Sequence, residues 1–162
     1  MRIEAKLEAM GLVLPSEATS PPGSAGPPNW IRVRNNIAYI SGQSARNPDG
    51  SVAGPFGKVP SEVSVDDARL AAHGAALTIL STLKRELGDL NRVSAWLSVT
   101  GMVNADPGFA GTSAVINGFS DFIIDLFGSE IGAHARTSPG MNSLPGNSAV
   151  VIAAIVEIDG ES

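Results

Sequence analysis

The chain has 162 residues, of which 43% are hydrophobic and 17% charged, a composition that predicts one folded domain and excludes a disordered chain. Its net charge is -5 and its lysines and arginines are scattered, which disfavours binding to nucleic acid. The absence of cysteine excludes disulfides, thiolate catalysis and cysteine-based zinc sites, and the two histidines, His73 and His134, lack the spacing of metal ligands.

The start of the chain is predicted to precede the main domain as a short helix and a linker. Arg2–Met10 carries apolar residues on one face, and the helix is expected to end at Gly11. Residues 15–28 are rich in Pro, Gly and Ser, which is typical of a linker. We therefore divide the chain into residues 1–28 and a domain at residues 29–162. No signal peptide or membrane-spanning run is predicted, so a cytoplasmic protein is expected.

Two short strands are predicted at residues 31–33 and 37–40. The polar turn between them contains Asn35 and Asn36, and asparagine tolerates left-handed backbone angles. Ser41-Gly42-Gln43 is expected to end the second strand. A loop rich in Gly and Pro follows.

The clearest helix is predicted from Ser64 to Leu87. Ser64 and Asp67 have the spacing of a capping box, and Gly88 supplies a stop signal. The expected buried stripe consists of five leucines, namely Leu70, Leu77, Leu80, Leu83 and Leu87. His73 lies on this helix, and we expect it to have a structural role.

The second half of the chain is predicted to alternate strands with one helix, in the order strand 92–102, helix 112–127, strand 135–143 and strand 149–158. Gly128 is expected to end the helix, and Pro139 and Gly140 interrupt the third segment. The last strand is apolar enough to be buried on both faces. This order predicts an α+β sandwich with two helices on one face of a sheet, whose other face packs against copies of itself.

Four short motifs in order resemble those of the Rid family, also called YjgF or endoribonuclease L-PSP. They are Ser41-Gly42-Gln43, the helix segment Val115–Gly118 with Ser120-Asp121, the segment His134-Ala135-Arg136-Thr137-Ser138, and Leu144-Pro145 before the last apolar strand. The resemblance covers about Trp30–Ile158 and indicates a divergent branch rather than the archetypal RidA deaminases. It implies a chorismate-mutase-like fold with a mixed sheet, a homotrimer with ligand sites between subunits, and no metal or organic cofactor.

The resemblance also assigns candidate site residues. Arg136 would bind the carboxylate of a small ligand, since a guanidinium holds a carboxylate with two parallel bonds. The backbone N–H of Ser138 would donate to the same carboxylate. Ser41 and Gly42 would face the ligand, although the Ser41 hydroxyl could instead cap its turn. Asn117 is a further candidate, which would either face the cleft or form a local hydrogen bond within its helix. Trp30 would either form an aromatic wall of the site or pack in the core.

One departure bears on activity. The resemblance places a water-positioning Glu in the last strand, and this chain has Val151 there. His134, expected on the same face as Arg136, is the nearest titratable substitute, although a hydrogen-bonded structural histidine at the start of the strand is the favoured interpretation. Two functions remain: a deaminase (a hydrolase that converts 2-aminoacrylate and related enamines or imines to 2-oxo acids and ammonia), and a non-catalytic trimer that binds small carboxylates through Arg136. An endoribonuclease is less favoured, because the chain is acidic.

Overall fold

The computed structural model describes residues 2–19 and 25–160, so part of the predicted linker, residues 20–24, lies outside the described residues. The helices are α1 (Ile3–Ala9), α2 (Val65–Leu87) and α3 (Thr112–Gly132), with short 3-10 turns at Leu90–Arg92 and Pro145–Asn147. The strands are β1 (Ile31–Arg34), β2 (Ile37–Gln43), β3 (Val93–Asn104), β4 (Ala135–Thr137), β5 (Gly140–Met141) and β6 (Val150–Ile158).

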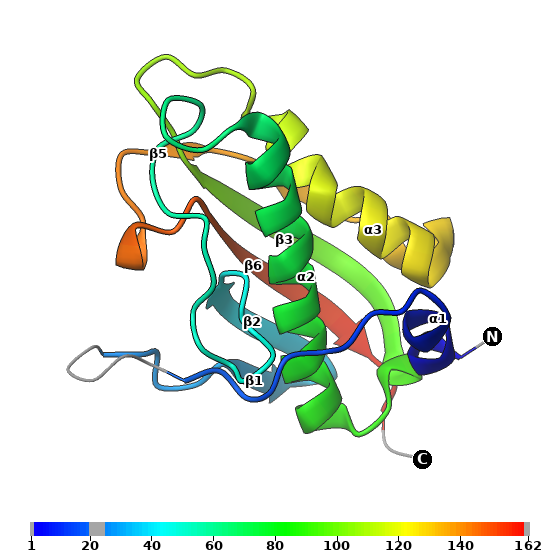
Figure 1. The fold of residues 1–162 in the computed structure, drawn as a ribbon. Coiled ribbons are helices and arrows are strands. Elements are labelled where there is room, and N and C mark those ends of the chain that lie inside the picture. The colour runs from blue at the N-terminus through cyan, green and yellow to red at the C-terminus, as the bar shows by residue number, and fades with distance from the viewer. Residues whose placement is uncertain (1, 20–24, 161–162) are drawn as a thin grey trace.

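These strands form one mixed sheet in the order β1-β2-β6-β3-β4, with β5 also paired to β3. The pairs β1–β2, β2–β6 and β6–β3 are antiparallel, whereas β4 and β5 run parallel to β3. Helices α2 and α3 lie side by side on the same face of the sheet (Figure 1). The predicted α+β class, with two helices covering one face of a mixed sheet, is confirmed.

Most boundaries match the sequence-based expectation, and the differences have local causes. The turn between β1 and β2 uses left-handed Asn35 and Asn36, with φ of 51° and 62°. Strand β2 does not end at Ile40, because a bulge between Ile40 and Gln43 lets the strand continue while Ser41 and Gly42 leave the regular register. Helix α3 does not end at Gly128 either: that residue breaks the helical geometry with φ 82° and ψ 161°, and one further turn follows.

The predicted leucine stripe on α2 is partly wrong. Leu70 is 69% exposed, whereas the buried face of the helix consists largely of alanine, namely Ala68, Ala71, Ala72, Ala75 and Ala76, followed by Ile79, Leu80 and Leu83. Small side chains let α3 approach closely: a Cβ on Gly118 would lie 2.2 Å from the Arg69 carbonyl oxygen. His73 packs on this contact, with its ring 4.4 Å from that of Phe122, as expected for a structural role.

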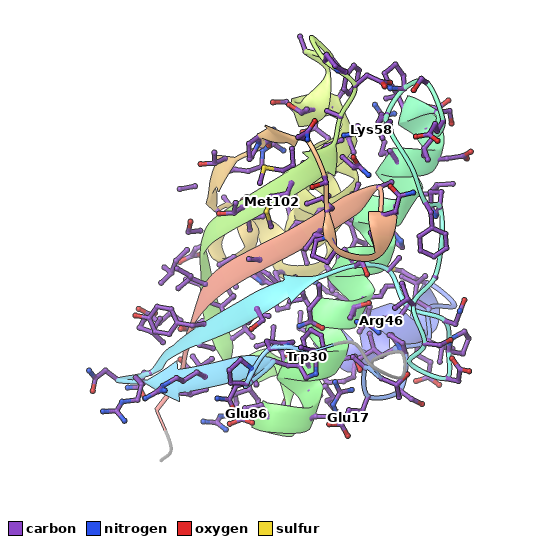
Figure 2. All side chains as sticks on the ribbon, turned by 90° about the vertical axis from the view of Figure 1, so that its left-hand side faces the viewer. Glu17, Trp30, Arg46, Lys58, Glu86 and Met102 are labelled. Atoms are coloured by element: carbon purple, nitrogen blue, oxygen red, sulfur yellow. The ribbon has the colours of Figure 1, made fainter. Side chains whose placement is uncertain are left out.

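The opposite face of the sheet is not covered by any of the described helices of the single chain. On β6, Ile152, Ala154, Val156 and Ile158 are buried under the helices. The alternate residues Ala153 and Ile155 are only partly buried, and Tyr39, which pairs with Ile155, is 49% exposed. The prediction that both faces of the last strand are buried is therefore wrong for one chain. Figure 2 looks onto this open face.

The N-terminal helix packs onto the same hydrophobic core. Ile3 and Leu7 are buried, and Lys6 Nζ donates to the carbonyl oxygen of Leu126 at 3.0 Å. Glu4 accepts hydrogen bonds from Lys84 Nζ and from the Leu90 N–H, both at 2.9 Å. Helix α1 thus joins the ends of α2 and α3. None of the described helices is long and apolar enough to cross a membrane.

Candidate functional site

Arg136 lies at the centre of a polar group of four side chains, the Arg136 cluster, which consists of Arg136, Asn117, Ser120 and His134. The edge strand β4 carries Arg136, and helix α3 carries Asn117 and Ser120 one turn apart, which places both on the same face of the helix. Arg136 Nη1 donates to Asn117 Oδ1 at 2.7 Å and to Ser120 Oγ at 3.1 Å. The predicted Arg136 and Asn117 therefore lie together.

His134 is the fourth member of the cluster and contacts Ser120. Its Nδ1 lies 2.7 Å from the Gly132 carbonyl oxygen, and its Nε2 lies 2.8 Å from Ser120 Oγ. A carbonyl only accepts hydrogen bonds, so Nδ1 carries the proton and Nε2 of the neutral ring accepts the Ser120 hydroxyl. Burial lowers the pKa of His134; the bond to the Gly132 carbonyl opposes this shift, and the Arg136 guanidinium adds to it. The lowered pKa favours the neutral ring, whose Nε2 orients Ser120 toward Arg136.

The charge of Arg136 has no acidic partner within the described part of the chain. Among the described residues, no carboxylate forms an ion pair with it. Its hydrogen bonds use Nη1 only, which leaves the Nε–Nη2 edge, the side on which a guanidinium grips a carboxylate with two parallel bonds. The arrangement can therefore present a fixed cation to an anionic ligand.

A separate pocket of about 480 Å³ holds most of the other predicted site residues. We call it the Trp30 pocket; its lining includes Trp30, Ser41, Gly42, Arg46, Pro145 and Val151. The bulge in β2 turns Ser41 and Gly42 toward it, and Val151 lies close by: a Cβ on Gly42 would approach Val151 Cγ1 to 2.9 Å. The pocket wall contains no Asp or Glu among the described residues.

The two predicted groups lie on different sides of the sheet within one chain. Arg136 is in register with Val99, which is buried under the helices, and its bonds to α3 point the same way. The Trp30 pocket is built on β2 and β6, and two strands, β6 and β3, separate β2 from β4. Three strand spacings amount to about 14 Å. A small ligand bound to one chain therefore cannot contact both the Arg136 cluster and the Trp30 pocket of that chain.

The remaining predicted residues have mixed surroundings. The Ser41 hydroxyl donates to the Asn29 carbonyl oxygen at 2.7 Å, which agrees with a turn-capping role and leaves its lone pairs unused. Ser138 Oγ is buried without a partner among the described residues, and its carbonyl oxygen accepts from Thr112 Oγ1 at 2.7 Å. No group of three or more His, Asp and Glu side chains capable of holding a metal was found within residues 2–19 and 25–160.

Sequence reasoning missed two residues of these sites. Ser120 was available from its spacing, because it lies three residues after Asn117 on a predicted helix. Arg46 lines the Trp30 pocket with its guanidinium carbon 5.5 Å from the centroid of the Trp30 ring. Its position in a loop carries no periodic signal, so the sequence alone gave no reason to select it.

Comparison with known proteins relates the chain to one curated protein and to several solved structures. Protein TCP17 of Trypanosoma cruzi is 33% identical over 160 residues, which cover 98% of this chain and 95% of TCP17. The crystal structure of Atu1372 from Agrobacterium tumefaciens, a protein of unknown function, is 37% identical with a TM-score of 0.85, covering 98% of this chain and 94% of Atu1372. No protein-family model matches the sequence.

More distant structures show the same fold. A protein from Shewanella oneidensis is 24% identical with a TM-score of 0.88 and covers 98% of this chain and all of its own. YyfA of Yersinia pestis, a conserved Rid-family protein of unknown function, is 21% identical with a TM-score of 0.60; the match covers 88% of this chain and 98% of YyfA. The match to YyfA thus leaves a part of this chain without a counterpart.

Proposed function

We propose that this chain, which has the fold of Rid-family proteins, belongs to that family and binds small 2-oxo or 2-imino carboxylates, with Arg136 as the anchor of the ligand carboxylate. The observation that carries the proposal is the unpaired Nε–Nη2 edge of Arg136. A partly buried guanidinium without an acid is costly unless an anion compensates it. Asn117 and Ser120 fix its orientation before a ligand arrives, so little ordering is lost on binding.

We further propose that the complete site forms between copies of the chain in a homotrimer. One copy would supply the Arg136 cluster, and its neighbour would supply the Trp30 pocket. Two observations support this arrangement: the two groups lie on different sides of the sheet in one chain, and the open face, with Tyr39, Ala153 and Ile155, lacks a cover. Burial of such a face between copies would remove its apolar surface from water.

Hydrolysis of enamines or imines is the second candidate function. In that reaction water adds to the C=N carbon of a 2-imino acid, the C–N bond breaks, and a 2-oxo acid and ammonia leave. The bound carboxylate would orient the C=N carbon, and the retained Arg136 and Asn117 favour such a role. The acid-free pocket, with Val151 on its wall, favours binding without fast turnover, because a valine can neither orient water nor accept a proton. Endoribonuclease activity is disfavoured by the net charge of -5.

His134 fits a positioning role better than a catalytic one. Both of its ring nitrogens are engaged within the cluster, one by the Gly132 carbonyl and one by Ser120. To act as a base toward the ligand, the ring would have to give up its bond to Ser120. We therefore propose that His134 holds Ser120, which in turn holds Arg136.

Isothermal titration calorimetry with a 2-oxo acid tests the anchor. The Arg136→Ala protein loses both guanidinium bonds to the carboxylate and should bind at least tenfold more weakly, since a hydrogen bond to a charged group contributes about 1.5–3 kcal/mol. Arg136→Lys should recover only part of the affinity, because a point charge does not reproduce the fork. Arg34→Ala, which removes an exposed charge from β1, is the matched control and should bind normally. Equal affinities in the natural and Arg136→Ala proteins would rule out Arg136 as the anchor.

A further inference from the structure

The Trp30 pocket contains a cation of its own, and Arg46 is held there in one orientation. Arg46 Nη1 donates to the Thr19 carbonyl oxygen at 2.6 Å and to the Gly50 carbonyl oxygen at 3.2 Å. The Thr19 N–H donates to the same Gly50 carbonyl at 3.1 Å, so the N-terminal segment and the loop after β2 are tied together at this point. Figure 2 shows Arg46 beside Trp30, whose ring it faces.

This guanidinium lacks the partner that its charge requires. No carboxylate among the described residues forms an ion pair with Arg46, and its Nε is buried without an acceptor. Burial lowers the pKa of the Arg46 guanidinium, which reflects the cost of removing its charge from water. The nitrogen occupied by these carbonyl groups is Nη1. Nε is enclosed, and Nη2, which forms no hydrogen bond among the described residues, remains for a charge-assisted bond to a carboxylate.

The rest of the pocket agrees with an anionic ligand. Its described wall carries Arg46 and no Asp or Glu, while Trp30, Pro145 and Val151 provide apolar surface for a carbon chain. A single oriented cation in an apolar pocket with few polar groups is the usual composition of a specific small-molecule site. A structural role confined to Thr19 and Gly50 would require only Nη1, and it would leave the positive charge of Arg46 without an acidic partner among the described residues.

We propose that Arg46 binds a second acidic group of the ligand, so that the ligand class of this protein is small dicarboxylates rather than monocarboxylates. This inference rests on the proposed function, in which Arg136 of a neighbouring copy binds the first carboxylate. Arg46 would then act as the specificity-determining residue, and Trp30 would hold its guanidinium plane in place through a cation–π contact.

Two acids of equal chain length test the proposal: 2-oxopentanedioate, which has two carboxylates, and 2-oxopentanoate, which has one. The natural protein should bind the diacid roughly 10- to 100-fold more tightly in calorimetry, the range expected for one charge-assisted pair. Arg46→Met, which keeps the apolar stem, should bind the two acids with equal affinity. Arg46→Lys should retain part of the preference. Arg34→Met removes the same charge from exposed β1 and should keep the full preference.

The outcomes separate this inference from the proposed function. Equal affinities in the natural protein, or a diacid preference that survives in folded Arg46→Met, would overturn the role of Arg46 alone. A diacid preference that disappears in Arg46→Met, together with unchanged affinities for both acids in Arg136→Ala, would overturn the Arg136 anchor and support Arg46. Failure of the natural protein to bind either acid at millimolar concentration would overturn both. Circular dichroism and thermal unfolding of each variant establish that the compared proteins are folded.

Discussion

Arg136 is oriented by neutral groups, and this choice of partners determines what it can do. An Asp or Glu in place of Asn117 would neutralise the guanidinium and compete with any ligand carboxylate. An amide oxygen and a hydroxyl instead fix its geometry while its positive charge remains available. At the residue scale, the site is therefore prepared for an anion.

Val151 offers a direct test of whether the protein is limited in catalysis by a missing acid. If water must be oriented by a carboxylate in the pocket, the natural protein should hydrolyse enzymatically generated 2-aminoacrylate feebly. Val151→Glu should then raise the rate; general acid–base assistance is worth about 10²- to 10⁴-fold, and an imperfectly placed graft would give less. A coupled assay of 2-oxo acid release measures both proteins.

The control for that substitution is Val151→Gln. Glutamine has nearly the shape and size of glutamate, but its amide cannot accept a proton in this range of pH. It should remain as slow as the natural protein. The new carboxylate in a wall residue that is 8% exposed will also lower stability, so circular dichroism must show that each variant is folded. Fast hydrolysis by the natural protein would contradict the binding role and would direct attention to His134.

His134 makes stability depend on pH in a defined direction. Because burial lowers its folded-state pKa below its ordinary value near 6.5, the unfolded chain takes up a proton first as the pH falls. The stabilisation is fully present above that value and decreases as the pH drops through it toward the folded-state pKa. Burial shifts His73 in the same direction, so the natural protein combines both effects.

The measurement is urea unfolding of the natural and His134→Gln proteins at pH 7.5 and pH 5.5. The natural protein should lose more stability between the two pH values than the variant, because the variant has lost one of the two titrating rings. The two proteins are compared by the change in the free energy of unfolding between the two pH values, because glutamine also alters the bond to Ser120 and so changes stability at both. An identical loss in both proteins would show that His134 titrates normally.

Among the elements, α1 is joined to the domain by buried side chains rather than only by surface charges. Leu7 is 4% exposed and belongs to the main core, whereas Val13, just after the helix, is 80% exposed. Leu7→Ala should lower the free energy of unfolding by about 2–5 kcal/mol, the usual cost of such a core cavity. Val13→Ala, the matched control, should change it little. Denaturant unfolding measures both, and similar small changes would show that α1 is not part of the cooperative core.

The same elements show how much the sequence could predict. Hydrophobic period and stop signals located every helix and most strands, because those signals are local. The alanine face of α2 was overlooked, since close packing against α3 at Gly118 depends on a partner that periodicity does not reveal. The bulge that turns Ser41 and Gly42 outward was equally hidden, because it arises from pairing of β2 with β6.

The candidate site divides in the same way. Motif spacing identified Arg136, Asn117 and His134, and the structure brings these three together around Ser120. Arg46 could not be found, because its surroundings come from carbonyl groups of Thr19 and Gly50 and from the ring of Trp30. These segments meet only in the folded chain.

At the scale of the whole molecule, the sheet separates the two parts of the proposed site. The Arg136 cluster lies on the helix-covered side at one edge, and the Trp30 pocket lies on β2 and β6. Since one chain does not bring them together, a site that uses both must form between neighbouring copies. A closed ring of identical subunits repeats such a shared site at every interface.

Mixed assemblies of two inactive variants test this requirement most directly. Arg136→Ala removes the anchor, and Gly42→Leu fills the pocket beside Val151, so each protein alone should bind a 2-oxo acid much more weakly than the natural protein does. When the two are unfolded and refolded together in equal amounts, about a quarter of interfaces combine an intact cluster with an intact pocket. Light scattering should report trimers, and calorimetry should recover binding at about that fraction of sites. Trimers that bind no ligand after mixing would contradict a site shared between copies.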